Sequence, residues 1–205
     1  MLEWLFLPLA FIIGSLPTSV WLGKFFYGID VRKHGSRNAG ATNAFRVLGK
    51  TMGFLVLCLD SLKGFAAIEL TKIINPDQDL EYYKLLLAGL VCVLGHVYSV
   101  FAKFKGGKGV ATSLGVYLAI NPYSALVVLV VFLIIFFSTR FVSLASLTAA
   151  ICLPFVSYFI FQKAEPISVI FNLTISILVV FTHTKNINRL IKGNEPKMNF
   201  SKKKA

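Results

Sequence analysis

The sequence is that of a hydrophobic and basic chain. Its 205 residues are 56% hydrophobic and 15% charged, and the net charge is +12. Soluble domains are about 45–50% apolar and about 25% charged, so this composition excludes a soluble domain and predicts an integral membrane protein. In a membrane protein the positive charge indicates basic cytoplasmic loops and attraction to anionic lipid heads. Nucleic acid is a poor candidate partner, because the charge is divided among short loops and a tail.

Uncharged runs long enough to cross a bilayer, about 20 residues, follow one another along the chain. With breakers such as Asn121-Pro122 and Glu165-Pro166 between them, they predict an all-α integral membrane protein with seven transmembrane helices, at residues 4–25, 51–71, 84–102, 109–120, 123–139, 142–161 and 167–184. No small-residue cleavage site follows the first run, so we expect a retained helix rather than a signal peptide. Helix 109–120 is short, because 12 residues rise only about 18 Å. Its start should therefore lie inside the protein.

Lysine and arginine are distributed unequally between the two sides that seven spans create. Sixteen of the 21 lie on one side, in loop 26–50, loop 103–108, Arg140 and the tail from Lys185. The positive-inside rule makes that side cytoplasmic, with the C-terminus, and places the N-terminus outside. We expect a single multi-pass membrane domain over residues 1–190, in the inner (plasma) membrane, and a basic, disordered cytoplasmic tail over residues 191–205.

Four polar groups then fall on the cytoplasmic side, and the first is HGSRNAGATNAFRVLGK (34–50). Arg46 offers a guanidinium fork for an oxyanion. Hydroxyl and amide groups that could bind the same ligand come from Ser36, Asn38, Thr42 and Asn43. The alternative is a re-entrant or interfacial loop whose polar groups only satisfy their own backbone. Even that alternative requires protein or a watery cavity around the loop.

The second group is the loop KFKGGKGVAT (103–112). Gly106, Gly107 and Gly109 let the backbone approach a ligand closely. The helix that follows directs its free amides toward the cytoplasmic side, and Lys108 adds a full charge there, which suits phosphate. The loop is not a Walker A motif, because Gly109 follows the lysine. A flexible basic loop is an equally good explanation of this stretch alone.

The remaining polar groups are FVSLAS (141–146), with Ser146, and HTKNINR (183–189). His183 and Asn186 share one helix face because they are three residues apart, and Arg189 continues that face. We expect His183 and Asn186 to contact a ligand. Inside the second span, Asp60 and Lys63 have the same spacing, which favours mutual neutralisation. His96 is expected to be packed and hydrogen-bonded rather than catalytic.

Several kinds of site are missing from the sequence. No histidine is followed five residues later by an aspartate, so the usual His/Asp acyltransferase pair is excluded. No paired aspartates suited to Mg²⁺ occur on the cytoplasmic side, and the three cysteines match neither a metal site nor a disulfide pattern. We expect no metal and no cofactor. A site with cations and hydroxyls but no carboxylate base should hold anions that are already activated for reaction.

The segments GSRNAGATNAFRVLGK, LDSLKG, GHVYSVFAKFKGGKGVATSLG and HTKNINRL together resemble the bacterial acyl-phosphate–glycerol-3-phosphate acyltransferase family. The resemblance extends from Gly14 to Arg189 and implies a seven-helix membrane enzyme. Such an enzyme transfers a fatty acyl group from acyl phosphate to the 1-hydroxyl of glycerol 3-phosphate. The products are lysophosphatidic acid and inorganic phosphate, in the first step of phospholipid synthesis.

By position, the resemblance assigns catalytic roles to five residues, namely Ser36, Arg46, Lys108, His183 and Asn186. Substrate-binding candidates are Asn38, Thr42, Asn43, Gly106, Gly107, Gly109, Thr112 and, more weakly, Ser146. The third motif of the family often reads H-R-E-N, whereas Lys185 stands here in place of the acidic residue. We interpret that acidic residue as a structural group whose partner can change.

Acyl phosphate and glycerol 3-phosphate are thus the expected substrates of a protein that we expect to be a monomer. The proton of the acceptor hydroxyl would pass to the substrate phosphate, or alternatively to His183. Two other classes remain open on the sequence alone. A transporter for a phosphorylated metabolite would use the same basic site for binding only. A Mg²⁺-dependent phosphotransferase acting on lipid head groups is the second alternative.

Overall fold

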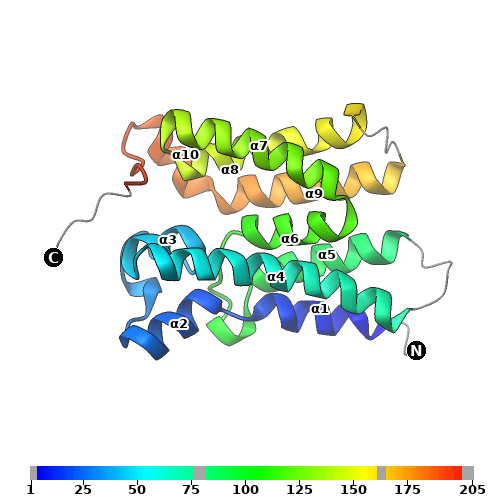
Figure 1. Cartoon of the computed structure of the whole chain (residues 1–205), viewed down its shortest axis with the longest axis horizontal. Helices are drawn as coiled ribbons and strands as arrows, with labels where there is room; N and C mark the ends of the chain where they lie inside the picture. The colour runs from blue at the N-terminus through cyan, green and yellow to red at the C-terminus, as the bar shows by residue number, and fades with distance from the viewer. Residues whose placement is uncertain (1–3, 76–81, 161–164, 200–205) are drawn as a thin grey trace. The chain divides into compact units, whose positions relative to one another are not determined.

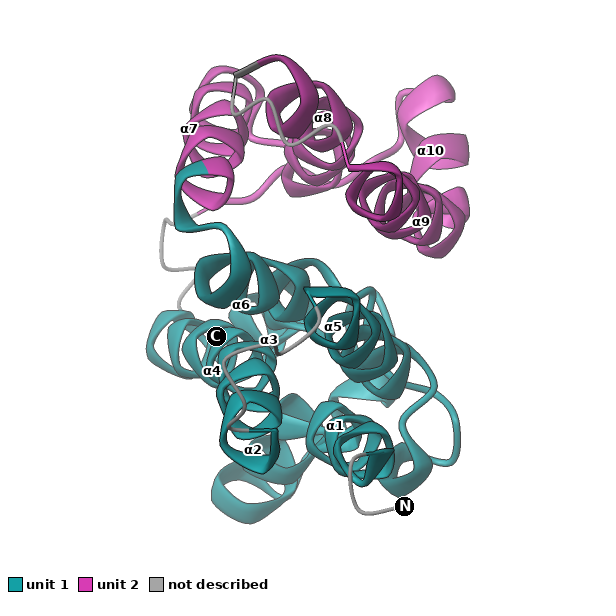
Figure 2. Cartoon of the chain, turned by 90° about the vertical axis from the view of Figure 1, so that its right-hand side faces the viewer, with its two compact units in different colours: residues 1–123 teal, residues 124–205 magenta. Residues whose placement is uncertain are grey.

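The computed structural model describes residues 4–75, 82–160 and 165–199, and within these ranges every regular element is a helix (Figure 1). Contacts divide the chain into two compact units, residues 1–123 and residues 124–205 (Figure 2). The sequence predicted one membrane domain over residues 1–190, whereas the contacts divide these residues between two compact units.

Unit 1 is built around its longest helix, α4 (Lys50–Ile74), which packs against α1, α3, α5 and α6. The bounds of these four helices are Phe6–Ser15 for α1, Ala41–Val47 for α3, Tyr82–Val97 for α5 and Val110–Ile120 for α6. Helix α2 (Thr18–Tyr27) and the short turns η2 (Val31–Lys33) and η3 (Val100–Ala102) complete the unit. The predicted polar loop 34–50 therefore contains a helix, α3, that was not predicted from the sequence.

The first predicted span, residues 4–25, is not one continuous helix. It consists of α1 and α2, which are bent by 40° relative to each other. Leu16, between them, has an extended backbone (ψ 112°), as is usual for a residue that precedes a proline. Pro17 also lacks the amide that would continue the hydrogen-bond ladder. Hydropathy extends across this break, so the run of apolar residues alone could not reveal it.

Helix α6 begins part-way along α4 rather than at its end. The two helices cross at Gly64 and Gly115, where an added Cβ would meet the backbone of Thr112 or of Ser61, respectively. Helix α6 starts five residues before this crossing, at a level about 14 Å along α4 from Lys50. The expected interior start of the short helix is thus visible in its packing against α4 (Figure 1).

Unit 2 contains most of α7 (Pro122–Thr139), together with α8 (Val142–Phe155), α9 (Pro166–Thr182) and α10 (Thr184–Ile191). Helix α8 continues into a π-helical turn over Val156–Ile160, and residue 161 of the predicted span lies outside the described residues. Helix α8 packs on α9, and α10 contacts both. A bend of 61° separates α9 from α10, at His183.

The described residues contain four helices that are long and apolar enough to cross a membrane, or six if each bent pair counts as one span. The 11 residues of α6 make a further, shorter apolar helix. An all-helical membrane architecture is therefore confirmed. The count of seven spans and the orientation of the termini stay predictions.

Candidate active site

The loop before α3 is organised by the buried side chain of Asn43. Its amide nitrogen lies 2.8 Å from the carbonyl oxygen of Val31, 2.9 Å from that of Asn38 and 3.2 Å from that of His34. Its amide oxygen accepts a hydrogen bond of 2.8 Å from the backbone amide of Ser36. Because these bonds use both ends of the amide, the geometry favours a role for Asn43 in shaping the loop rather than in binding substrate.

The other candidates of this loop are half-buried, which suits contact with a ligand. Arg46 lies in the last turn of α3, and Ser36, Asn38 and Thr42 precede it. The hydroxyl groups of Ser36 and Thr42 have no hydrogen-bond partner within the part of the chain that the structure describes. These hydroxyls are therefore available to a bound molecule.

Asp30 and Arg32 connect the first polar group to the second. The Asp30 carboxylate accepts from the Arg32 side chain, with Nη2 at 2.7 Å, and caps the turn η2 through the Arg32 amide at 3.0 Å. The hydrogen bond from the Arg32 side chain lowers the pKa of Asp30 to about 2. Nη1 of Arg32 also donates to the carbonyl oxygen of Ala102 at 2.7 Å. The structure thus ties the segment just before loop 34–50 to the residue just before the glycine loop, within unit 1.

The glycine loop (residues 103–109) uses most of its own amides. All five amides from Lys103 to Gly107 donate to backbone carbonyls of residues 96–102. A Cβ on Gly106 would collide with the carbonyl of His96, and one on Gly107 with the imidazole ring of His96. This geometry favours a packing role for Gly106 and Gly107, since their lack of side chains lets the loop close on the end of α5.

The part of the glycine loop that remains able to bind an anion is therefore its last residues, next to the start of α6. Gly109, with φ +85°, is the N-cap of α6, and the first amides of a helix have no partner within it. Lys108 is half-buried immediately before this turn. In the first turn of α6, Thr112 is fully buried, and its hydroxyl has no hydrogen-bond partner among the described residues. A cation, helix amides and an unsatisfied hydroxyl suit a phosphate group.

In unit 2, His183 and Asn186 are both buried at the junction of α9 and α10. Nδ1 of His183 lies 2.8 Å from the carbonyl oxygen of Val179, and because a carbonyl can only accept, Nδ1 carries a proton in this contact. Nε2 is then the nitrogen that can accept a proton in the neutral ring. Asn186 has a different partner, which the sequence analysis missed.

That partner is Glu195, whose carboxylate holds three side chains. Oε1 accepts from Oγ of Ser143 at 2.7 Å and from Nδ2 of Asn186 at 2.6 Å, and Oε2 accepts from Nε of Arg189 at 2.6 Å. Burial raises the pKa of Glu195, but the hydrogen bonds from these three groups outweigh it, so the pKa is lowered. The sequence analysis found no carboxylate base among the candidate residues, and Glu195 places a carboxylate beside Asn186.

The segment that carries Glu195 lies within residues 191–205, the tail that the sequence predicted to be disordered, and it makes contacts at the start of α8. The amide of Met198 donates to the carbonyl oxygen of Arg140 at 2.8 Å, and the ammonium of Lys197 lies 5.4 Å from the centre of the Phe141 ring. Glu195 and Met198 are thus buried near the start of α8, because both have partners there. For residues 200–205, which lie outside the described residues, disorder stays a prediction.

Two other features of the third and fourth polar groups have structural explanations. Ser146 is buried on α8, and its hydroxyl donates to the carbonyl oxygen of Val142 one turn earlier, at 2.9 Å. Lys185, which stands in place of the acidic residue of the family motif, is exposed. Because Glu195 already supplies the carboxylate for Asn186, the substitution at position 185 leaves that asparagine with an acidic partner.

Comparison with known proteins identifies the family. A sequence model described as glycerol-3-phosphate acyltransferase matches residues 4–193. The chain belongs to the glycerol-3-phosphate acyltransferase family. The glycerol-3-phosphate acyltransferase of Fusobacterium nucleatum is 44% identical over 195 residues, which cover 95% of this chain and 97% of the relative. That of Bacillus cytotoxicus is 43% identical over 202 residues, which cover 98% of each chain.

Solved structures of a member of the glycerol-3-phosphate acyltransferase family support the same assignment. Crystal structures of PlsY (YgiH), an integral membrane glycerol 3-phosphate acyltransferase, match in its glycerol 3-phosphate form with a TM-score of 0.88 and in its lysophosphatidic acid form with 0.85. Both are 38% identical, and the match to the first covers 96% of each chain. The chain is accordingly a membrane-embedded acyltransferase, as the resemblance of its motifs implied.

Proposed function

We propose that the chain transfers a fatty acyl group from acyl phosphate to the 1-hydroxyl of glycerol 3-phosphate, which yields lysophosphatidic acid and inorganic phosphate. One observation carries this proposal, namely the end-to-end match to PlsY in its glycerol 3-phosphate and lysophosphatidic acid forms. These two molecules differ by one acyl group on a glycerol hydroxyl, so they are the acceptor and the product of an acyl transfer. The site faces the cytoplasm in this proposal, as the distribution of basic residues favours.

We assign phosphate binding to Ser36, Arg46 and Lys108 in unit 1 and to His183 and Asn186 in unit 2. The accessible hydroxyl of Ser36 and the amides at the start of α6 support the first assignment. Hydrogen-bond donors also stabilise negative charge that develops on the acyl carbonyl oxygen. Holding the two substrates together contributes further, because it replaces a bimolecular encounter with a positioned one.

The state of the carboxylates supports acyl phosphate as the donor. Asp30 is paired with Arg32, Asp60 with Lys63, and Glu195 with Arg189, so none of the three is suited to remove a proton. A mixed anhydride needs little help from a base, because phosphate is a good leaving group. The glycerol oxygen attacks the acyl carbon, the bond from that carbon to the phosphate oxygen breaks, and the hydroxyl proton passes to a substrate phosphate.

An assay with purified protein tests the proposal. We expect inorganic phosphate to be released only when acyl phosphate and glycerol 3-phosphate are both present, in equal amount to the lysophosphatidic acid formed. Acyl-coenzyme A serves as the control donor. Acylation of glycerol 3-phosphate from acyl-coenzyme A alone would overturn the proposed donor. Binding of glycerol 3-phosphate without any acylation would instead indicate a transporter.

A further inference from the structure

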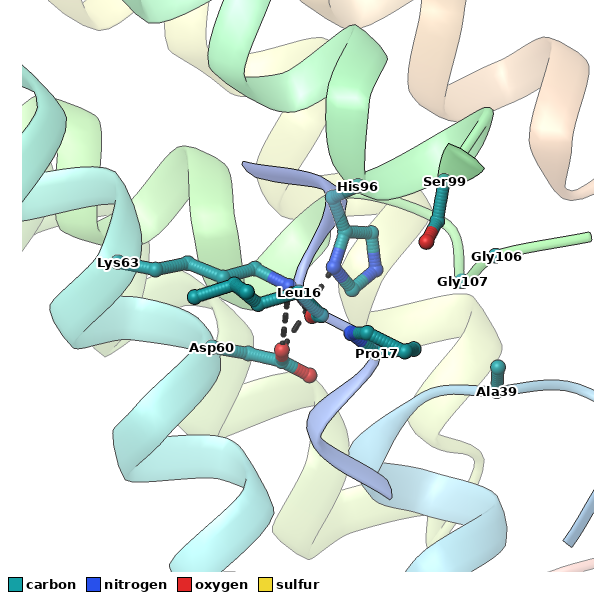
Figure 3. A pocket seen from close by; sticks show the side chains of 9 residues that line it. All are labelled: Leu16, Pro17, Ala39, Asp60, Lys63, His96, Ser99, Gly106 and Gly107. Atoms are coloured by element: carbon teal, nitrogen blue, oxygen red, sulfur yellow. Dashed lines mark hydrogen bonds and ion pairs between the residues drawn. The ribbon is translucent and has the colours of Figure 1, made fainter. Parts of the chain in front are cut away.

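A buried cluster of charges lies in unit 1 and contains none of the residues assigned to phosphate binding. Nζ of Lys63 lies 2.7 Å from Oδ1 of Asp60, as the spacing of the two residues predicted. The same oxygen accepts from the hydroxyl of Thr18 at 2.7 Å, and Nδ1 of His96 is 3.6 Å away. Figure 3 shows the side chains of Asp60, Lys63 and His96 pointing toward one another. Each is less than a tenth exposed.

The cluster contacts the break between α1 and α2 and, through His96, the glycine loop. Lys63 also donates to the carbonyl oxygen of Leu16 at 2.9 Å, in the break between α1 and α2. The carbonyl of His96 accepts from the amide of Gly107 at 3.1 Å, and the imidazole fills the space that a Gly107 side chain would need. Asp60, Gly107 and Ala39, of loop 34–50, line one pocket.

The level of the cluster explains why charge is present there. Asp60 is ten residues into α4, about 15 Å from Lys50, and α6 begins at nearly the same level. A glycine loop at this depth needs polar protein groups around it, since irregular backbone is not tolerated against lipid. The ammonium of Lys63 satisfies the carbonyl at one such break, and Asp60 balances its charge.

We propose that Asp60, Lys63 and His96 are positioning residues, which hold the glycine loop and the break before α2 in the arrangement that places Lys108 and the start of α6 for phosphate binding. This proposal rests on the proposed function. A buried ion pair adds little net stability compared with apolar residues of the same size. Oδ2 of Asp60 is buried and has no hydrogen-bond partner among the described residues, so the cluster is poorly built for stability alone.

The kinetic test compares Asp60→Asn with Thr71→Val, a buried polar residue about 16 Å further along the same helix. In folded Asp60→Asn protein we expect kcat/KM for glycerol 3-phosphate to fall about a hundredfold, as a displacement of the site of about 1 Å produces. The loss should appear mainly in KM and in weaker inhibition by inorganic phosphate. Thr71→Val should retain wild-type values. A folded Asp60→Asn variant with wild-type kinetics would overturn the proposal.

If Asp60→Asn does not fold, the neutral double variant Asp60→Asn/Lys63→Met replaces it, because it leaves no unpaired buried charge. We expect this variant to fold and still to have the raised KM, since nothing then holds the carbonyl of Leu16. Wild-type kinetics in the folded double variant would contradict a positioning role and indicate that the pair only stabilises the unit.

A second measurement does not depend on activity. Hydrogen–deuterium exchange of the purified protein should become faster in residues 98–109 of the tested variant, while α9 in unit 2 keeps its wild-type rate. Unchanged exchange in residues 98–109 would overturn the proposal whatever the kinetics show. If the wild-type protein proves unable to acylate glycerol 3-phosphate, the proposed function fails, and this exchange measurement still decides whether the cluster holds the loop.

Discussion

At the scale of single residues, the carboxylate of Glu195 holds three side chains of unit 2 together. One carboxylate joins α8, through Ser143, to two residues of α10, Asn186 and Arg189. Because Asn186 is a candidate phosphate ligand, Glu195 fixes the direction in which the amide can face. Hydrogen bonds that involve a charged group contribute about 1.5–3 kcal/mol each to stability. The carboxylate therefore serves both the stability and the geometry of this unit.

Replacement of Glu195 by glutamine should lower the free energy of unfolding at neutral pH by about 1–3 kcal/mol. The pKa of Glu195 is lowered in the folded protein, so its contribution is present above the ordinary value of 4.5 and is lost as the pH falls through the folded-state pKa. Thermal unfolding at a series of pH values should show this loss in the wild type and a smaller one in Glu195→Gln. Glu69→Gln, at a half-exposed surface pair, is the control and should change little.

Arg46 provides the sharpest single-residue test of the active site. We expect Arg46→Ala to abolish nearly all acyltransferase activity while the protein still folds. The ammonium groups of nearby lysines cannot replace a guanidinium, which binds a phosphate group through two parallel hydrogen bonds. The exposed cation Lys33 supplies the matched variant, Lys33→Ala, which should stay active. Activity and thermal unfolding are measured on both. Retention of most activity in Arg46→Ala would refute the assigned site.

At the scale of elements, the crossing of α4 and α6 decides where the glycine loop lies. Gly64 and Gly115 bring the two backbones together, and a side chain at either position would meet backbone atoms that cannot move aside as a side chain can. The close crossing fixes the level of Gly109 and of the first turn of α6. The position of a functional loop therefore depends on two glycines that do not belong to it.

Substitution of Gly115 by alanine should push α6 away from α4. Overpacking of this kind costs about 1–3 kcal/mol, and the displaced helix start should also raise KM for glycerol 3-phosphate. Leu114→Met, a volume-conserving change on the same helix, should leave both quantities near their wild-type values. Thermal unfolding and steady-state kinetics check this pair, and normal stability of Gly115→Ala would mean that the helices are not held by this contact.

At the scale of the whole molecule, the positive-inside rule makes a prediction about the two faces of the membrane. In a variant without its native cysteines, Lys105→Cys should react with a membrane-impermeant maleimide from the cytoplasmic side only. Glu165→Cys should react from the opposite side only. Labelling of both cysteines from the same side of oriented vesicles would contradict an odd number of spans between residues 105 and 165.

The sequence predicted much of the architecture because hydropathy is a property of long segments. The predicted spans 51–71 and 123–139 end within three residues of α4 and α7. The break at Leu16-Pro17 was missed, since apolar residues continue on both sides of it. Helix α3 was missed because seven residues among glycines and polar side chains give no clear period.

The candidate site was predicted only in part, for a related reason. Motif spacing placed Asn186 and Arg189 on one face of a helix. It could not show that Glu195 accepts their hydrogen bonds, because Glu195 approaches them only after the chain reverses direction. Gly193, with φ +70°, and Asn194 form a pair typical of such a turn. A basic tail interrupted by Gly193-Asn194 and a single acidic residue was the signal that the sequence contained.

The depth at which α6 begins has a consequence for how the site responds to salt. Mobile ions screen charges over about 8 Å at physiological ionic strength, and they do so effectively only where they have access. Lys108 is half-buried, and with the first amides of α6 it lies about 14 Å along α4 from Lys50, so mobile ions reach it less than they reach the exposed lysines. We therefore expect the KM for glycerol 3-phosphate to change little between 50 and about 500 mM salt, whereas association with anionic vesicles through the exposed lysines should weaken steeply over the same range.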